Sequence, residues 1–157
     1  MLRGHFDSQE LPCYGASGAA KSPFGEVPHR VDVGVDVIEI ARIARVVGRH
    51  AAGMQRRVYT ELEWRQCHRS IASLAGRFAA KEAVMKALGV GGMPFRHIEI
   101  ARLPSGKPEV RLYGRMQRRA ERLGVTAIHI SISHSRDNAV AVAIAELTNP
   151  DAGSRSA

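Results

Sequence analysis

The chain has 157 residues, a formal net charge of +8 and an isoelectric point near 10.3. This length suits one domain with a single hydrophobic core, and no apolar run approaches the ~20 residues of a membrane-spanning helix. The charge favours an anionic partner: nucleic acid, an anionic cofactor or an acidic protein. The only cysteines, Cys13 and Cys67, lack ligand spacing. We therefore expect no disulfide framework, no structural zinc, no membrane partner and a reducing, cytoplasmic location.

Both ends of the chain lack a hydrophobic period. Residues 1–29 are rich in Gly, Ser, Ala and Pro, and we expect a poorly ordered N-terminal extension there. Residues 149–157 have the same character and are expected to form a flexible tail. The N-terminus has no apolar stretch of the kind found in secretory signals. The predicted domain is therefore residues 30–148.

The first half of this domain predicts one strand and three helices. Residues 31–37 alternate apolar with small or polar side chains, which indicates a strand. A helix is expected from residue 39 to about 50. Thr60 and Glu63 have capping-box spacing, which predicts a helix from there to about residue 68. A long helix should follow over residues 71–88, with Gly89 as its C-cap.

The second half is mostly strand. Residues 97–101 and 109–112 flank a Pro-Ser-Gly-Lys-Pro turn, which indicates a hairpin. A short basic helix is expected over residues 115–123, and two further strands over 128–133 and 139–146. Because strands and helices do not alternate regularly, the pattern favours an α+β fold with a largely antiparallel sheet packed against the long helix.

Asp36 is the first residue that could carry chemistry. It lies near the end of an apolar strand, where a carboxylate costs free energy unless it is paired or binds a metal. Position alone favours a simpler interpretation, in which Asp36 caps the helix that follows.

Glu82 is the second, and it lies among cationic side chains. Glu82 and Lys86 are spaced i,i+4, which predicts an ordinary surface pair on the long helix. The alternative is that Asp36 and Glu82 hold Mg²⁺ while Lys81 and Lys86 hold phosphate charge, since magnesium accepts carboxylate, phosphate and water oxygens.

Two further groups of residues are less specific. Ser131 and Ser133 share one strand face with His134 at the turn, but no Gly-x-Ser-x-Gly motif is present, so a nucleophile–base pair is the least favoured interpretation. Arg42, Arg45 and Arg49 fall on one side of the first helix. They form a solvated face, a docking stripe for an acidic helix or a phosphate-tracking surface. The aromatic content of 5% argues against nucleic acid as partner.

Three segments, in this order, closely resemble the holo-acyl-carrier-protein synthases, the small type of 4′-phosphopantetheinyl transferase. They are residues 34–43 (GVDVIEIARI), 76–87 (GRFAAKEAVMKA) and 129–135 (HISISHS). The resemblance spans roughly residues 31–147 and implies the 4′-phosphopantetheinyl transferase fold. The N-terminal extension has no counterpart in that family, and the glycine loop after the long helix is short.

The resemblance implies an activity and a site. Such enzymes move 4′-phosphopantetheine from coenzyme A to a serine of acyl carrier protein and release adenosine 3′,5′-bisphosphate, in homotrimers with active sites at subunit clefts. The matching residues would be the Mg²⁺ ligands Asp36 and Glu82, the catalytic residues Glu82 and Lys86, the coenzyme A contacts Arg77, Lys81, Lys86, His134 and Ser135, and the carrier-protein contacts Arg42 and Arg49. We hypothesise that Glu82, directly or through a water, takes the serine proton.

Two rival functions come from other classes. One is a binding module whose basic faces hold RNA or DNA, with an affinity that Mg²⁺ chelation and Asp36→Ala leave unchanged. The other is a structural trimer that has kept the fold without turnover. The presence of both acidic residues and both lysines argues against the second rival.

Overall fold

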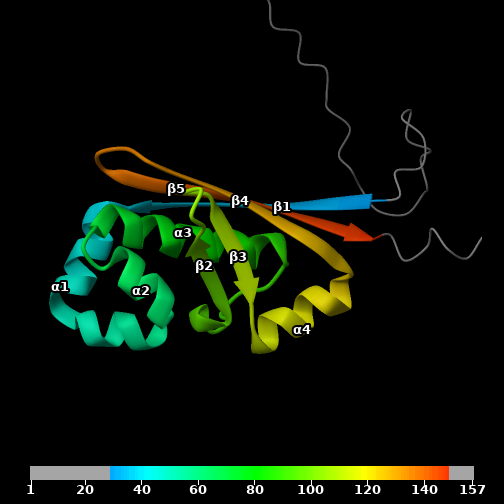
Figure 1. The fold of residues 1–157 in the computed structure, drawn as a ribbon, viewed down its shortest axis with the longest axis horizontal. Coiled ribbons are helices and arrows are strands. Elements are labelled where there is room, and N and C mark those ends of the chain that lie inside the picture. Colours follow the sequence, from blue (N-terminus) through cyan, green and yellow to red (C-terminus); the bar gives the residue numbers. More distant parts are fainter. Residues whose placement is uncertain (1–28, 149–157) are drawn as a thin grey trace, which may run out of the picture.

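The computed structural model describes residues 29–148. Three long strands form one sheet. The helices and a separate two-stranded hairpin lie on one side of this sheet, and its other face is open to solvent (Figure 1). The expected extension and tail lie outside the described residues, except that residue 29 already belongs to the first strand. The predicted α+β class with an antiparallel sheet is confirmed.

The main sheet has the strand order β1-β5-β4. β1 (His29–Glu39), β4 (Val125–His134) and β5 (Asn138–Thr148) are all longer than the alternation predicted. β5 pairs antiparallel with both neighbours, so Asp36 lies opposite Ala141, and Ala141 lies opposite Ile132. β1 and β4 are therefore the two edges of the sheet.

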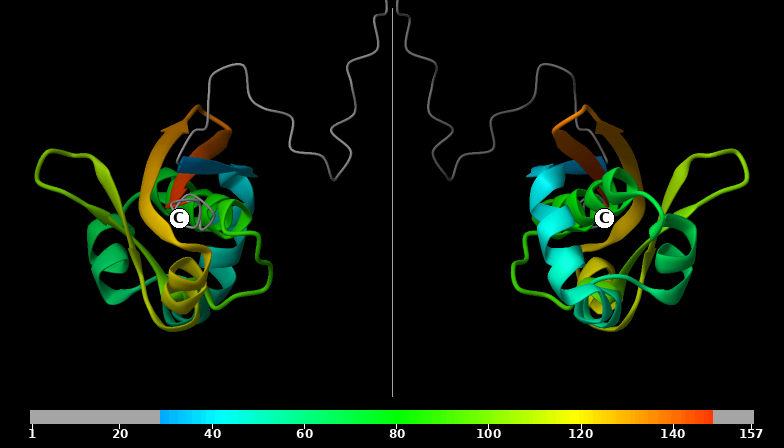
Figure 2. Two further views of the ribbon diagram at one scale, coloured as in Figure 1. Left: turned by 90° about the vertical axis from the view of Figure 1, so that its right-hand side faces the viewer. Right: turned by 90° about the vertical axis from the view of Figure 1, so that its left-hand side faces the viewer.

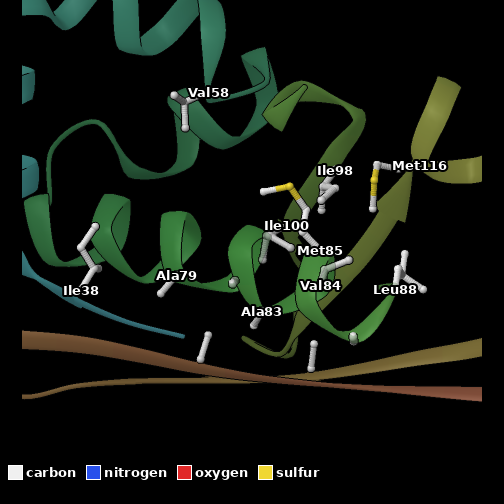
Figure 3. Packing of buried hydrophobic residues seen from close by; sticks show 14 of the residues in the cluster. Ile38, Val58, Ala79, Ala83, Val84, Met85, Leu88, Ile98, Ile100 and Met116 are labelled. Carbon is white, nitrogen blue, oxygen red and sulfur yellow. The ribbon is translucent and has the colours of Figure 1, made fainter. Parts of the chain in front are cut away.

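The long helix α3 (Ile71–Ala87) covers one face of this sheet (Figure 3). Along β5 the odd-numbered residues from Ala139 to Leu147 are buried beneath it, whereas the even-numbered ones face outward. The alanines on α3 and β5 let the two backbones approach closely. At Gly34 of β1 the approach is closest, because a Cβ there would collide with the backbone of Ala83 and Ala87. The core is thus built on a small-residue contact between β1 and α3.

The first helix differs from its prediction. α1 (Ile40–Arg57) continues well past the expected end near residue 50, and the change of direction occurs at His50, whose φ and ψ (−142°, 40°) are not helical. The predicted capping box is confirmed in α2 (Glu61–Cys67): Thr60 accepts from the Glu63 amide, while the Glu63 side chain accepts from the Thr60 amide.

The remaining elements form a second, smaller unit of the same domain. A 3₁₀ turn η1 (Phe95–His97) leads into β2 (Ile98–Arg102) and β3 (Pro108–Leu112), and α4 (Gly114–Leu123) then returns the chain to β4. The β2–β3 hairpin projects away from the body (Figure 2). The predicted C-cap is one residue too late: α3 ends at Ala87, Leu88 is its C-cap, and Gly89 follows in the left-handed region (φ +62°). No helix among residues 29–148 is long and apolar enough to cross a membrane.

Candidate active site

Asp36 and Lys86 meet where the edge strand β1 crosses the end of α3. The Lys86 ammonium donates to Asp36 Oδ1 at 2.9 Å and to the Val35 carbonyl at 2.8 Å. The Lys86 side chain is 53% exposed and that of Asp36 is 17% exposed. These two residues are 50 positions apart in the chain, so the fold, and not local sequence, creates the pair.

Glu82 completes this group. Its carboxyl pKa is raised, first by partial burial and then by the negative charge of Asp36, while Lys86 acts in the opposite direction. The two carboxylates therefore lie close enough to repel each other, and Lys86 compensates only part of that repulsion. The expected i,i+4 surface pair does not form, because Lys86 pairs with Asp36.

Local structure explains why these side chains share one edge. The alternation of β1 places Asp36 on the same side as Gly34 and Ile38, toward α3. Because α3 turns 100° per residue, Glu82 and Lys86 lie within about 40° of each other on it. The absence of a side chain at Gly34 then lets β1 come near enough for Lys86 to reach Asp36.

The simpler interpretation of Asp36 as a helix cap is wrong. The N-cap of α1 is Glu39, and no side chain caps that end of the helix. The first amide of α1, at Ile40, donates instead to the carbonyl of Asp137 in the β4–β5 turn, at 2.8 Å. Asp36 lies more than one residue before this end, and its carboxylate is directed to Lys86.

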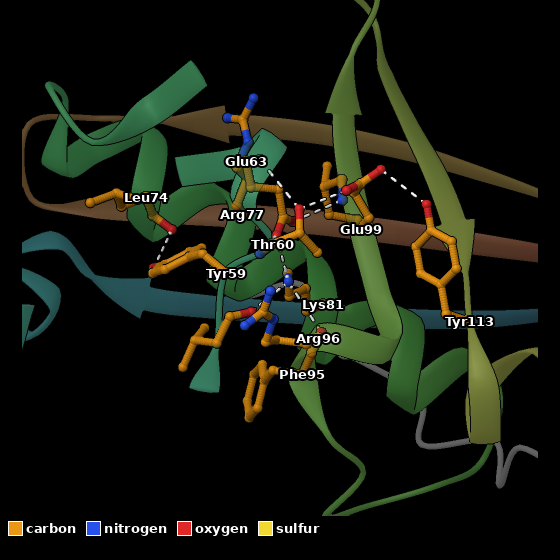
Figure 4. A network of polar contacts seen from close by, with 12 residues as sticks. Tyr59, Thr60, Glu63, Leu74, Arg77, Lys81, Phe95, Arg96, Glu99 and Tyr113 are labelled. Atoms are coloured by element: carbon orange, nitrogen blue, oxygen red, sulfur yellow. Dashed lines mark hydrogen bonds and ion pairs between the residues drawn. The ribbon is translucent and has the colours of Figure 1, made fainter. Parts of the chain in front are cut away.

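Lys81 does not join this group. Its side chain has no exposed surface, and its ammonium donates to Glu63 Oε2, Val58 O and Phe95 O at 2.7, 2.6 and 3.1 Å (Figure 4). One position along a helix is a turn of 100°, which directs Lys81 away from Glu82 and toward α2 and η1. The expectation that Lys81 and Lys86 contact phosphate together is thus corrected for this chain: they point to different surroundings.

Arg77 lies on the same side of α3 as Lys81. Its Nη2 donates to Gln66 Oε1 at 3.4 Å, and its buried Nε has no partner among the described residues. The guanidinium also lies near Tyr59 and Cys67, where its positive charge opposes part of the rise that burial causes in their pKa values. Glu82 lies about 140° around the helix from Arg77, whose guanidinium contacts α2 and not Asp36.

His134 and Ser135 lie at the other edge of the sheet. His134 ends β4, two strands from β1, and strands spaced about 4.8 Å apart put β4 about 10 Å from β1. The Ser135 hydroxyl instead closes the β4–β5 turn by accepting from the amides of Asp137 and Asn138. Within one chain, the structure does not bring these two residues to Asp36, Glu82 and Lys86.

Arg42 and Arg49 are exposed on the first part of α1, together with Arg45. No salt bridge within residues 29–148 involves any of these three arginines. Their charges are therefore presented to solvent, as a docking surface for an acidic partner requires.

The donor set at Asp36 and Glu82 fits a hard divalent cation. Two neighbouring carboxylates that repel each other would be stabilised by a positive ion between them. Within the described part of the chain no group of three or more His, Cys, Asp or Glu side chains is placed to hold a metal. A two-carboxylate site suits Mg²⁺, which takes its remaining ligands from water and substrate phosphates.

Comparison with known proteins gives one consistent result. The model of the 4′-phosphopantetheinyl transferase superfamily matches residues 32–145. The chain belongs to this superfamily. Holo-[acyl-carrier-protein] synthases of Herpetosiphon aurantiacus and Moorella thermoacetica are 48% and 44% identical to it, over 71% and 78% of this chain and 94% and 99% of theirs. Among solved structures, the Helicobacter pylori holo-[acyl-carrier-protein] synthase in complex with coenzyme A superposes with a TM-score of 0.66 at 32% identity, covering 72% of this chain and 98% of that one.

Membership of the superfamily confirms the resemblance seen in the three motifs, and with it the predicted fold and class of enzyme. The match also covers the part of the chain that carries Asp36, Glu82, Lys86 and His134. The buried residues Glu63 and Glu99, by contrast, were missed by sequence reasoning. Only the capping-box spacing of Glu63 hinted at a role, and that signal concerned the helix end alone.

Proposed function

We propose that this chain transfers 4′-phosphopantetheine from coenzyme A to a serine of apo acyl carrier protein and releases adenosine 3′,5′-bisphosphate. The observation that carries this proposal is the group formed by Asp36, Glu82 and Lys86, in which two carboxylates and one ammonium share a solvent-facing edge. Its relatives that bear the name holo-[acyl-carrier-protein] synthase support the choice of both substrates.

The reaction needs no nucleophile from this chain. The serine oxygen of the carrier protein attacks the β-phosphorus of coenzyme A, the bond from that phosphorus to the bridging oxygen breaks, and adenosine 3′,5′-bisphosphate leaves with the electron pair. Glu82 is the proposed acceptor of the serine proton, directly or through a water, because it is the second carboxylate beside Asp36 and Lys86. Lys86 is the proposed contact for charge on the phosphates.

Asp36 and Glu82 are the proposed ligands of Mg²⁺. When bound, the ion would neutralise pyrophosphate charge and polarise the phosphoryl oxygens. The protein's part is to hold two carboxylates at one edge and to keep Lys86 beside them, so that the negative substrate meets a fixed positive partner.

Coenzyme A is expected to contact residues from both edges of the sheet. Lys86 belongs to the β1 edge, whereas His134 and Ser135 belong to the β4 edge, and Arg77 faces α2. One chain keeps these groups apart. We therefore propose that His134, Ser135 and Arg77 serve the site of a neighbouring copy, in a homotrimer with active sites at subunit clefts. Lys81 is left out of the proposed coenzyme A contacts because its ammonium is buried.

The outer face of the main sheet supports self-association. Its valines on β1 are more than half exposed, with Val33 at 61% and Val37 at 63%, and Val140 and Ile144 of β5 lie on the same face. An apolar strip of this kind on the open face of a sheet is typical of a protein–protein interface. We propose that this apolar face is buried against other copies of the same chain. Sedimentation analysis should give a trimer, and Val33→Lys together with Val37→Lys should give a monomer.

Arg42 and Arg49 are the proposed contacts of the carrier protein. Exposed, unpaired arginines attract an acidic surface, and such attraction weakens as salt rises. Cytoplasmic location remains a prediction; the buried free thiol of Cys67 fits a reducing compartment.

One experiment tests the proposed activity. The full chain is incubated with apo acyl carrier protein, coenzyme A and Mg²⁺, and the carrier is examined by intact mass for phosphopantetheine on serine. Asp36→Ala and EDTA should each abolish the mass gain. If no gain appears, while the chain binds RNA or DNA equally well with EDTA and with Asp36→Ala, the nucleic-acid-binding alternative holds instead.

A further inference from the structure

Lys81 and Glu63 form an ion pair at the centre of the molecule. Both side chains have no exposed surface, and Lys81 Nζ lies 2.7 Å from Glu63 Oε2. Burying two charges is costly unless every donor and acceptor is satisfied. Lys81 precedes the proposed active-site residue Glu82 in α3, so the pair belongs to the helix that carries the proposed site.

Every polar atom of this pair is satisfied by protein. An ammonium has three donors, and Lys81 uses them on Glu63 Oε2, Val58 O and Phe95 O. Glu63 accepts from the Thr60 amide at Oε2 and from the Ile100 amide at Oε1. Lys81 therefore has no donor left for a substrate phosphate.

The pair joins segments that are far apart in the sequence. Val58 is the C-cap of α1, Thr60 caps α2, Phe95 begins η1 and Ile100 lies in β2. Each of these four residues is hydrogen-bonded either to Lys81 of α3 or to its partner Glu63. Rotation or sliding of α3 would break several of these bonds together, so the pair fixes the helix about its axis.

Lys81 makes no contact with Glu82. All three donors of its ammonium are taken up by Glu63 Oε2, Val58 O and Phe95 O. The Lys81 ammonium is paired with Glu63 and leaves the helix about 100° around its axis from Glu82. Any effect of Lys81 on the reaction must therefore pass through the position of the α3 backbone.

We propose that Lys81 and Glu63 are positioning residues, which hold α3 in the rotation that places Glu82 and Lys86 beside Asp36. This inference rests on the proposed function, because it assigns Glu82 and Lys86 to the transfer site. A phosphate-binding role for Lys81 makes a different prediction. If Lys81 bound phosphate, replacing both Lys81 and Glu63 with neutral residues would weaken coenzyme A binding; if the pair only positions α3, it would not.

The test uses Lys81→Met and the double variant Glu63→Gln/Lys81→Met. Lys81→Met leaves a buried carboxylate unpaired, and we expect kcat to fall about 100-fold, the cost of a misplacement of about 1 Å. The double variant removes both charges while keeping an oxygen and an amide at position 63. It should regain at least tenfold in kcat, with a KM for coenzyme A within about twofold of wild type.

Lys86→Met is the matched control, since it removes a lysine from the same helix on the exposed side. It should raise the KM or Kd for coenzyme A by about tenfold. A double variant that weakens coenzyme A binding as much as this control would overturn the proposal in favour of a phosphate contact. A double variant that regains wild-type melting temperature but not kcat would overturn it as well.

Binding measurements separate this inference from the proposed function. Calorimetry gives the Kd of coenzyme A for wild type and the double variant without any carrier protein. If wild type neither binds coenzyme A nor modifies a carrier, the proposed function fails for reasons unconnected with Lys81. If wild type does both and Lys81→Met is folded with unchanged kcat, only the positioning role is wrong. Should Lys81→Met not fold, the double variant alone decides by the same criteria.

Discussion

Two lysines five positions apart on α3 each pair with a carboxylate from another element. The two pairs have similar N–O distances but very different exposure to solvent. Lys81–Glu63 spans 2.7 Å with both side chains fully buried, whereas Lys86–Asp36 spans 2.9 Å with side chains 53% and 17% exposed. The buried lysine has all its donors on protein oxygens. The exposed lysine keeps a face toward solvent, beside a carboxyl with a raised pKa.

The two pairs thus differ in burial, which decides whether their charges can be reached by a substrate. A buried pair is held by several hydrogen bonds and is strongly destabilised when one partner is lost. An exposed pair adds little to folding, and its charges remain available to a substrate. Variants at the two lysines should therefore divide into those that change stability and those that change turnover.

The largest expected effect is on stability, at the buried pair. Lys81→Met should lower the free energy of unfolding by about 3–5 kcal/mol, because Glu63 would be left as an unpaired buried charge. Urea denaturation at neutral pH measures this. Lys86→Met should change the same quantity by less than about 0.5 kcal/mol. Equal losses in the two variants would remove the distinction between the pairs.

The exposed pair should show its effect in turnover. Lys86→Met should lower kcat/KM for coenzyme A about 100-fold, or about 2.7 kcal/mol of transition-state stabilisation, because a charge-assisted phosphate contact is lost. Steady-state assays with saturating carrier protein and varied coenzyme A measure it. A change of less than threefold would show that Lys86 serves Asp36 alone.

A smaller effect is expected at the docking surface, where the lysine pairs play no part. Arg42→Glu should raise the KM for carrier protein about tenfold, or about 1.4 kcal/mol, and leave the KM for coenzyme A unchanged. Arg115→Glu, at another exposed arginine, on α4, is the matched control and should have less than a threefold effect. Equal effects at both positions would indicate attraction to net charge without a defined docking site.

The smallest expected effect concerns the two carboxylates beside Lys86. A carboxyl whose pKa is higher in the folded state binds its proton more tightly there, so stability is lost as pH rises through that pKa. In EDTA at neutral pH, Glu82→Gln should therefore be more stable than wild type, by less than about 1 kcal/mol because Glu82 is partly exposed. Melting curves should converge below about pH 4, where Glu82 is protonated in both folded and unfolded chains. If Glu82→Gln were less stable than wild type at neutral pH, the carboxylates of Glu82 and Asp36 would not repel each other in the folded chain.

Local patterns predicted most of the fold, whereas the pairing of Asp36 with Lys86 depends on the contact between β1 and α3. Alternation located β1, and capping-box spacing located the start of α2, because both depend on neighbouring residues alone. The longer extent of α1 was missed, since a change of direction at His50 does not end the helix. Asp36, Glu82 and Lys86 were candidates from their surroundings in the sequence, and the motifs that resemble a known family suggested that they act together.

Lys81 was misplaced for a physical reason. Adjacent residues of a helix point 100° apart, so sequence proximity to Glu82 does not mean spatial proximity. Its true partner, Glu63, is 18 residues away on another helix. Only the packing of α2 against α3 reveals that pair, and no periodic signal in the sequence encodes it.

The acceptors that hold Lys81 impose unequal constraints on the chain. Two of the three are main-chain carbonyls, at Val58 and Phe95, and any residue supplies a carbonyl. In a saturation-mutagenesis library, positions 58 and 95 should accept other apolar side chains that preserve the packing, whereas positions 63 and 81 should tolerate almost none singly. The substitutions tolerated at these two positions should mostly be double ones, in which Glu63 and Lys81 are both replaced by neutral residues. The buried pair therefore requires positions 63 and 81 to change together.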